Sequence, residues 1–252
     1  MAQEYPKAFA RFYDTIYHEL RDDTDHQFFL DKIAATKGKV LEIGVGTGRF
    51  FIDALNSGAD AYGIDVSREM LNVLKDKLSP ANHRRLSQQS ITEFRLEEKF
   101  NLILAPFRVI MHVLDKESQL KALNNVFDHL APEGTYIFDT FVPNPEHLAK
   151  GMNKVTDFEG EHAPGQALRR IVSTSPDIVN QLIEIHFRLE WQEDGREHAE
   201  DWHLPLRFFF RYELEHLLER SLFGKSYEIH GDYKGNPLSK DSKEFIVICR
   251  KL

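Results

Sequence analysis

The segment from Val40 to Phe50, which reads VLEIGVGTGRF, constrains the fold more than any other part of the sequence. An apolar run ends at Ile43, and glycine then occupies every second position before an amphipathic segment begins. Glycine permits positive φ angles and lets a ligand approach the backbone, while the first turn of the following helix presents unpaired N–H groups. A strand, a glycine-rich turn and a helix in this order predict an α/β fold that binds a nucleotide-like ligand at the turn.

Beyond this turn, short apolar segments continue to alternate with amphipathic ones. Because neighbouring parallel strands need crossover connections, the alternation predicts a doubly wound, Rossmann-like α/β sheet with helices on both faces. We expect strands at 39–44, 60–65, 84–88, 100–105, 134–141, 225–230 and 245–249, and helices at 48–57, 67–78, 116–130 and 211–222.

After Pro143-Asn144-Pro145 the apolar period changes to two. The odd positions from 183 to 191 are apolar and the even ones polar, a turn follows at 193–196, and a return strand runs to about residue 206. With a further strand at 166–175, this pattern predicts an antiparallel β layer inserted into the α/β domain. We expect a helical segment at 1–36, the main domain at 37–145 and 207–252, and the inserted β subdomain at 146–206.

Composition narrows the possible partners. The chain has 252 residues, 32 Lys and Arg against 40 Asp and Glu, and a net charge of −8, so we expect no nucleic-acid partner. No apolar run approaches the roughly 20 residues of a membrane span, and the N-terminus does not resemble a secretory signal. Cys249 is the single cysteine and the histidines lack ligand spacing, so we expect a cytoplasmic protein with no disulfide and no metal site.

Asp65 ends the second expected strand, 19 positions after Gly46. A carboxylate there can take both hydroxyls of a ribose; the alternative is a plain tight turn in which Asp65 caps the next helix. A dinucleotide fingerprint, G-x-G-x-x-G, would need glycine at position 49, where the chain has Arg49. The sequence therefore disfavours a nicotinamide-dependent reductase, the alternative kind of enzyme.

Glu42 completes the pattern E-x-G-x-G-x-G, which resembles the first motif of the class I S-adenosylmethionine-dependent methyltransferases. Residues 100–105 resemble that family's fourth strand, and 130–139 resemble its L-x-P-G-G turn and fifth strand, with Glu133 in place of one glycine. The tail, at 206–214 and 231–238, resembles the bacterial-type small-molecule branch, which includes sugar N-methyltransferases. The resemblance implies a seven-stranded, mostly parallel sheet with an inserted antiparallel β layer, and an N-terminal helical lid.

S-adenosyl-L-methionine is the cofactor that this resemblance implies. The third-strand motif lacks the family's acidic residue, so Gln89 or Ser90 is expected to accept the adenine hydrogen bond, with Ile91 on one ring face. Met70 is expected on the other face, or simply in the core. The residues predicted to bind the cofactor are Tyr13, Glu42, Gly44, Gly46, Asp65, Val66, Met70, Gln89, Ser90, Ile91 and Ala105.

Methyl transfer from a sulfonium is an in-line displacement, for which a well-aligned, water-poor site matters more than an added charge. Because the family often needs no general base for an amine acceptor, no catalytic residue is assigned. Tyr13 and His112 are the candidates. Core packing explains Tyr13 equally well, and for His112 a hydrogen-bonded structural role is favoured over that of a base. The residues predicted to contact the acceptor are Arg207, Arg211, Tyr212 and Tyr233.

We therefore predict an S-adenosylmethionine-dependent methyltransferase that acts on a nitrogen or oxygen atom of a small molecule. The alternatives are a catalytically silent S-adenosylmethionine-binding protein, and an RNA or protein methyltransferase. The inserted layer is expected either to border the acceptor pocket or to form the surface of a homodimer.

Overall fold

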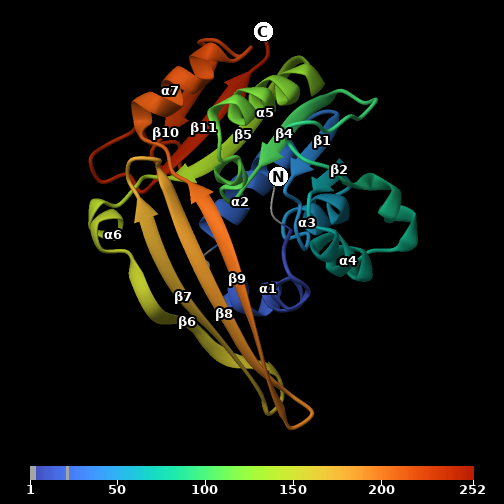
Figure 1. Ribbon diagram of the computed structural model, residues 1–252. Coiled ribbons are helices and arrows are strands. Elements are labelled where there is room, and N and C mark those ends of the chain that lie inside the picture. Colours follow the sequence, from blue (N-terminus) through green and yellow to red (C-terminus); the bar gives the residue numbers. More distant parts are fainter. Residues whose placement is uncertain (1–3, 21–22) are drawn as a thin grey trace.

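The computed structural model describes residues 4–20 and 23–252 (Figure 1). Its main sheet has seven strands in the order β10-β11-β5-β4-β1-β2-β3. β1 to β5 are parallel, and β11 runs antiparallel to both β5 and β10. The strands are β1 (Lys39–Ile43), β2 (Asp60–Asp65), β3 (Leu86–Gln88), β4 (Phe100–Ala105), β5 (Leu130–Phe141), β10 (Tyr227–His230) and β11 (Glu244–Arg250).

Helices cover both faces of this sheet, as the sequence predicts. Apolar side chains of α5 (Lys116–His129) and α7 (Arg211–Arg220) form one core with the sheet. The opposite core contains side chains of α2 (Thr24–Ala35), α3 (Phe51–Asn56) and α4 (Arg68–Lys77). None of the helices in the described residues is long and apolar enough to cross a membrane.

A second, four-stranded antiparallel sheet confirms the predicted inserted layer. Its strands are β6 (Met152–Ala163), β7 (Gln166–Asp177), β8 (Leu182–Glu193) and β9 (Arg196–Arg207), in that order, and the short helix α6 (Pro145–Lys150) precedes them. In Figure 1 this sheet projects from the main domain as a long layer, with α1 (Lys7–Leu20) beside it.

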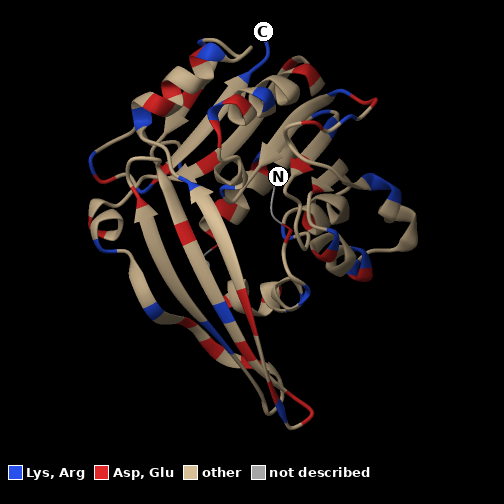
Figure 2. Cartoon of the chain, viewed as in Figure 1, with Lys and Arg blue, Asp and Glu red and all other residues tan. Residues whose placement is uncertain are grey.

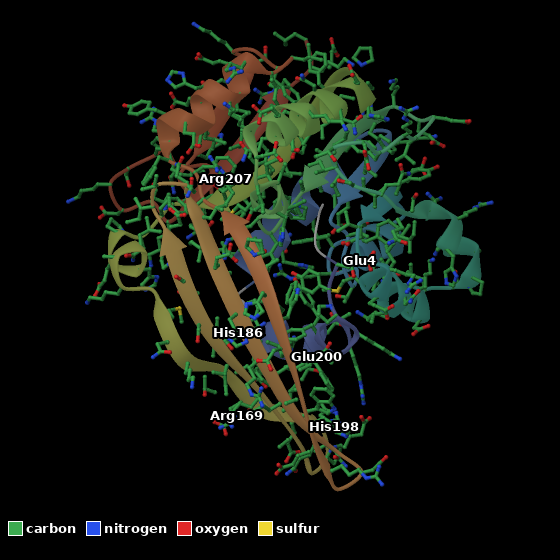
Figure 3. All side chains as sticks on the ribbon, in the orientation of Figure 1. Glu4, Arg169, His186, His198, Glu200 and Arg207 are labelled. Atoms are coloured by element: carbon green, nitrogen blue, oxygen red, sulfur yellow. The ribbon has the colours of Figure 1, made fainter. Side chains whose placement is uncertain are left out.

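The two faces of the inserted sheet differ as the period of two predicts. Phe187 and Leu189 are buried against Phe9 and Phe12 of α1. The other face carries charged residues of both signs, among them Arg188 and Glu190 of β8, and Figure 2 marks the positions of charged residues along the strands. On this face the His186 Nε2–H donates a hydrogen bond to the Asp201 carboxylate at 2.8 Å, and Arg169 forms an ion pair with Glu190; Figure 3 labels His186 and Arg169.

Several element boundaries differ from the predicted ones. The expected helix at 48–57 is shortened to α3, because Gly48 has a φ of 92° that no right-handed helix contains. A 3₁₀ turn at Pro80–Arg85 replaces the start of the third predicted strand. β6 was not expected, because it reads MNKVTDFEGEHA and buries only Phe158 among its twelve side chains. Glu133, which stands in place of a glycine of the resembled motif, has a φ of 59°, in the left-handed region that favours glycine.

A buried ion pair fixes the inserted sheet against α1. Arg170 of β7 is 5% exposed, and its guanidinium donates two hydrogen bonds to Asp157 of β6, at 3.0 and 2.8 Å. The same guanidinium lies over the rings of Tyr17 on α1 and Phe187 on β8, 4.9 Å from each ring centroid. Arg170 therefore joins three elements at once.

We predict that Asp157→Ala lowers the free energy of unfolding by about 3 kcal/mol, because it leaves the buried Arg170 cation without its carboxylate. The double variant Asp157→Ala/Arg170→Met should recover part of this loss, since it removes the stranded charge. Urea unfolding of the wild type and both variants measures the effect. Equal stability of the single and double variants would contradict it.

Candidate functional site

A cavity of about 340 Å³ lies at the carboxyl ends of β1, β2 and β4, within the size range of ligand pockets. The turn after β1, the ends of β2 and β3, the segment after β4 and the N-terminal region with α1 all contribute to its walls. Of the residues predicted to bind the cofactor, those that line it are Tyr13, Glu42, Gly44, Gly46, Asp65, Val66, Met70, Gln89, Ser90 and Ile91.

The three glycines of the turn after β1 serve different purposes. All have positive φ angles, of 71° at Gly44, 53° at Gly46 and 92° at Gly48. A Cβ at Gly44 would lie 2.4 Å from Val109, and one at Gly48 would lie 2.3 Å from Leu74, so both positions need glycine for packing. A Cβ at Gly46 would have its nearest neighbour 3.9 Å away. Gly46 therefore leaves open space in the wall of the cavity.

The Asp65 carboxylate ties this turn to the end of β2. One oxygen accepts a hydrogen bond from the Gly46 N–H at 2.9 Å, and the other accepts one from the Ser67 N–H at 2.8 Å. Ser67 is the N-cap of α4, and its hydroxyl accepts a hydrogen bond from the Met70 N–H. The alternative prediction that Asp65 caps this helix is therefore wrong, because Ser67 does so.

Two buried carboxyl groups give the cavity an acidic wall. Burial raises the pKa of Glu42 well above its usual range, with repulsion from Asp65 adding to the effect and Arg49 opposing it. Burial also raises the pKa of Asp65, against the hydrogen bonds from Ser67 and Gly46. Both shifts reflect carboxylates held with little compensating positive charge. A ligand that carries positive charge would therefore stabilise both ionised groups.

At the far end of the cavity, Met70 and Ile91 present buried apolar surfaces. The predicted acceptors beside them already have local partners. The Gln89 side-chain oxygen accepts a hydrogen bond from the Arg95 N–H at 2.7 Å, and the Ser90 hydroxyl bonds to that of Thr92 at 2.9 Å. A carbonyl or hydroxyl oxygen can accept a second hydrogen bond, so these contacts are compatible with the prediction.

Aromatic rings gather at the mouth of the cavity. The Tyr13 ring lies 5.9 Å from Tyr5 and 4.4 Å from Tyr17, and Tyr17 lies 5.6 Å from Phe107. Phe107 and Arg108 both have left-handed backbones, with φ angles of 57° and 67°. Such strain costs about 1–3 kcal/mol for each residue and concentrates at functional sites. The sequence contains no signal for it, because it depends on how the segment after β4 packs.

His112 lies in the wall of the same cavity, on the turn Val109–His112. Burial lowers its pKa to about 4. The imidazole is therefore neutral at physiological pH and a weak base. No group of three or more His, Cys, Asp or Glu side chains in the described residues is arranged to hold a metal ion.

Five of the predicted site residues do not line this cavity. Ala105 is fully buried in β4. Arg207, labelled in Figure 3, donates to the Asn180 carbonyl at 2.9 Å and pairs with Glu213. On α7, Arg211 pairs with Glu215, and Tyr212 is 67% exposed. In the segment after β10, the Tyr233 hydroxyl donates a hydrogen bond to Asp139 at 2.8 Å.

The four acceptor residues are predicted because the inserted layer and the loop at 231–233 border the acceptor pocket in the resembled family. Sequence order does not show the local partners that hold these side chains. The structure does not bring Arg207, Arg211, Tyr212 and Tyr233 to this cavity. Conversely, it places Tyr5, Arg49 and Phe107 in the wall, and none of these was among the predicted binding residues.

We predict that His112 makes the fold sensitive to acid. Its pKa is about 4 in the folded protein and near 6.5 when unfolded, so the unfolded state binds the proton more tightly between these values. The free energy of unfolding should therefore decrease as the pH is lowered. His112 should account for about 1–2 kcal/mol of this decrease between pH 7.5 and pH 5. Urea unfolding at both pH values should show a smaller loss in His112→Gln than in the wild type. An identical loss would exclude His112 as the source.

Comparison with known proteins identifies the domain. Residues 40–134 match the family described as methyltransferase domain. A putative methyltransferase of Bacillus subtilis, YqeM, is 27% identical over 129 residues, which span 50% of this chain and 52% of that protein. The dTDP-3-amino-3,4,6-trideoxy-alpha-D-glucopyranose N,N-dimethyltransferase of Streptomyces venezuelae is 24% identical over 169 residues, or 67% of this chain and 68% of the relative.

Solved structures show the same fold. An S-adenosylmethionine-dependent methyltransferase from Clostridium acetobutylicum superimposes with a TM-score of 0.76 at 19% identity, over 96% of this chain and 97% of the other. Residues 40–134 thus match a methyltransferase domain, in agreement with the prediction, and the chain has the fold of an S-adenosylmethionine-dependent methyltransferase.

Proposed function

We propose that the protein transfers a methyl group from S-adenosylmethionine to a small molecule, at a nitrogen or oxygen atom, with nitrogen favoured. The observation that carries this proposal is the cavity at the turn after β1, where Gly46 leaves room and Glu42 and Asp65 provide an acidic wall. When bound, S-adenosylmethionine supplies an electrophilic methyl group on a positively charged sulfur atom.

The residues of this cavity fit such a donor in shape and charge. The missing Cβ of Gly46 lets the ligand approach the backbone, and the two buried carboxyl groups favour a ligand with positive charge. We propose that Asp65 holds the ribose, while Met70 and Ile91 enclose the adenine ring. Gln89 or Ser90 would accept the hydrogen bond from the adenine amino group.

The chemistry of the mouth favours an amine acceptor. A hydroxyl must lose its proton to become a good nucleophile, whereas a neutral amine attacks with its own lone pair. His112 has a pKa of about 4, so it is too weak a base to remove a hydroxyl proton efficiently. The rings of Tyr5, Tyr13 and Phe107 offer apolar faces that exclude water from this region. The sugar N,N-dimethyltransferase among the relatives supports the same choice.

The other predictions about partners remain predictions. On the face seen in Figure 2, Lys and Arg are mixed with Asp and Glu, which gives no support to a nucleic-acid acceptor. A homodimer through the inserted layer and a cytoplasmic location are likewise proposals, the second supported by the single, buried cysteine.

A two-step experiment tests the proposed function. First, S-adenosylmethionine and S-adenosylhomocysteine should raise the melting temperature, whereas NADH should not. At 100 times its dissociation constant, either of the first two ligands should raise the free energy of unfolding by about 2.7 kcal/mol. Second, the protein is incubated with donor carrying a labelled methyl group and with matched pools of amines, alcohols and phenols. We expect label in the amine pool. Stabilisation by NADH alone would overturn the proposal, and donor binding without any labelled product would indicate the catalytically silent alternative.

We predict that Gly46→Ala lowers affinity for S-adenosylhomocysteine at least tenfold, because the new methyl group fills space that the ligand needs. The matched control is Gly58→Ala, at a φ of 84° with no atom within 4 Å of the new Cβ. Both variants carry a similar backbone cost of about 1–2 kcal/mol, so their melting temperatures should fall alike. Titration calorimetry should show reduced affinity in Gly46→Ala alone; equal affinity in the two variants would contradict the assignment.

A further inference from the structure

The order of strands gives the cavity a direction. β3 and β2 lie on one side of β1, and β4 lies on the other. Under the proposed function, Asp65 at the end of β2 holds the ribose, and the residues after β3 surround the adenine. The amino-acid end of the donor therefore lies over β1 and β4, beside the turn after β1.

Arg49 is placed at this end. It lies in the turn between β1 and α3, its side chain is 23% exposed, and it forms part of the cavity wall. Its two terminal nitrogens donate to the two oxygens of Asp25 on α2, at 2.6 and 2.7 Å. The Asp25 side chain is only 12% exposed. This two-point pairing, made from α2, fixes the plane of the guanidinium.

Arg49 differs in the sign of its charge from the other charged side chains of the cavity wall. Among the described residues that line the cavity, the other formally charged side chains are those of Glu42, Asp65 and Asp115, all of them acidic. The amino-acid end of the donor carries an ammonium group, which these acidic side chains suit, and a carboxylate, for which Arg49 is the oppositely charged side chain in the wall. A guanidinium has five N–H donors in a planar fork that matches carboxylates.

We propose that Arg49 binds the α-carboxylate of the methyl donor, and that Asp25 is a positioning residue that orients Arg49. This inference rests on the proposed function and extends it to the amino-acid end of the same ligand. It also explains position 49, where the dinucleotide fingerprint has glycine for close packing. Here Gly48, against Leu74, occupies the close-packed position, and position 49 is available for a long polar side chain.

A structural role is the competing explanation, since the pair with Asp25 also ties α2 to the turn. Two ligands separate the two roles. S-adenosylhomocysteine carries the amino-acid end, whereas 5′-methylthioadenosine has the same adenosine and thioether sulfur without it. A carboxylate contact affects only the first ligand, while a distorted turn affects both.

The experiment is titration calorimetry of both ligands with the wild type, Arg49→Met, Arg49→Lys and Asp25→Asn. Arg220→Met, at an exposed position of α7, is the matched control for loss of an arginine. We expect Arg49→Met to bind S-adenosylhomocysteine at least tenfold more weakly and 5′-methylthioadenosine within twofold of the wild type. Arg49→Lys and Asp25→Asn should show smaller losses, confined to S-adenosylhomocysteine, and Arg220→Met should show none.

Equal losses for the two ligands in Arg49→Met, or no loss for either, would overturn the inference. If Arg49→Met fails to fold, Arg49→Lys decides the question, because it keeps the charge but not the fork. A wild-type protein that binds neither ligand would instead contradict the proposed function itself, so the two failures are distinguishable.

Discussion

The paired hydrogen bonds of the Asp65 carboxylate are the interaction on which the site depends. They hold the Gly46 and Ser67 amides, and so they fix the turn after β1 relative to the start of α4. Both oxygens accept hydrogen bonds within the fold, yet burial still raises the pKa of the group, which means that the ionised form is only partly compensated. A single side chain thus sets the backbone geometry of the cavity and much of its electrostatic preference.

Around this centre, the cavity combines rigid and adaptable walls. The strand ends of the parallel sheet supply the acidic groups, since Glu42 lies within β1 and Asp65 ends β2, and both side chains are buried. The mouth comes from α1 and the strained segment after β4, where the Tyr17 ring packs against both Tyr13 and Phe107. The division suits the proposed methyl transfer, in which the buried strand ends would hold the donor and the mouth would receive the acceptor.

How much the sequence could predict depends on how local each feature is. The turn after β1, Glu42 and Asp65 were predicted because one strand–turn–helix unit and a fixed spacing carry them. β6 escaped because it is largely polar, and the Arg49–Asp25 pair escaped because α2 meets the turn only in the folded protein. Likewise, nothing in the sequence shows that Phe107 and Arg108 are left-handed, or that local partners draw Arg207 and Tyr233 away from the cavity.

The position of α1 has a mechanical consequence. Its apolar face, with Phe9 and Phe12, is buried against the inserted sheet, and Arg170 lies over Tyr17. Toward the main domain, Asp14 accepts hydrogen bonds from Thr47 and Lys77, at the edge of the glycine-rich turn. The contact with the inserted sheet is buried and largely apolar, whereas the contact with the turn is polar and partly exposed to solvent. Because dissolved ions screen exposed charges far more than they affect buried apolar contacts, high ionic strength should loosen α1 from the glycine-rich turn before it loosens α1 from the inserted sheet.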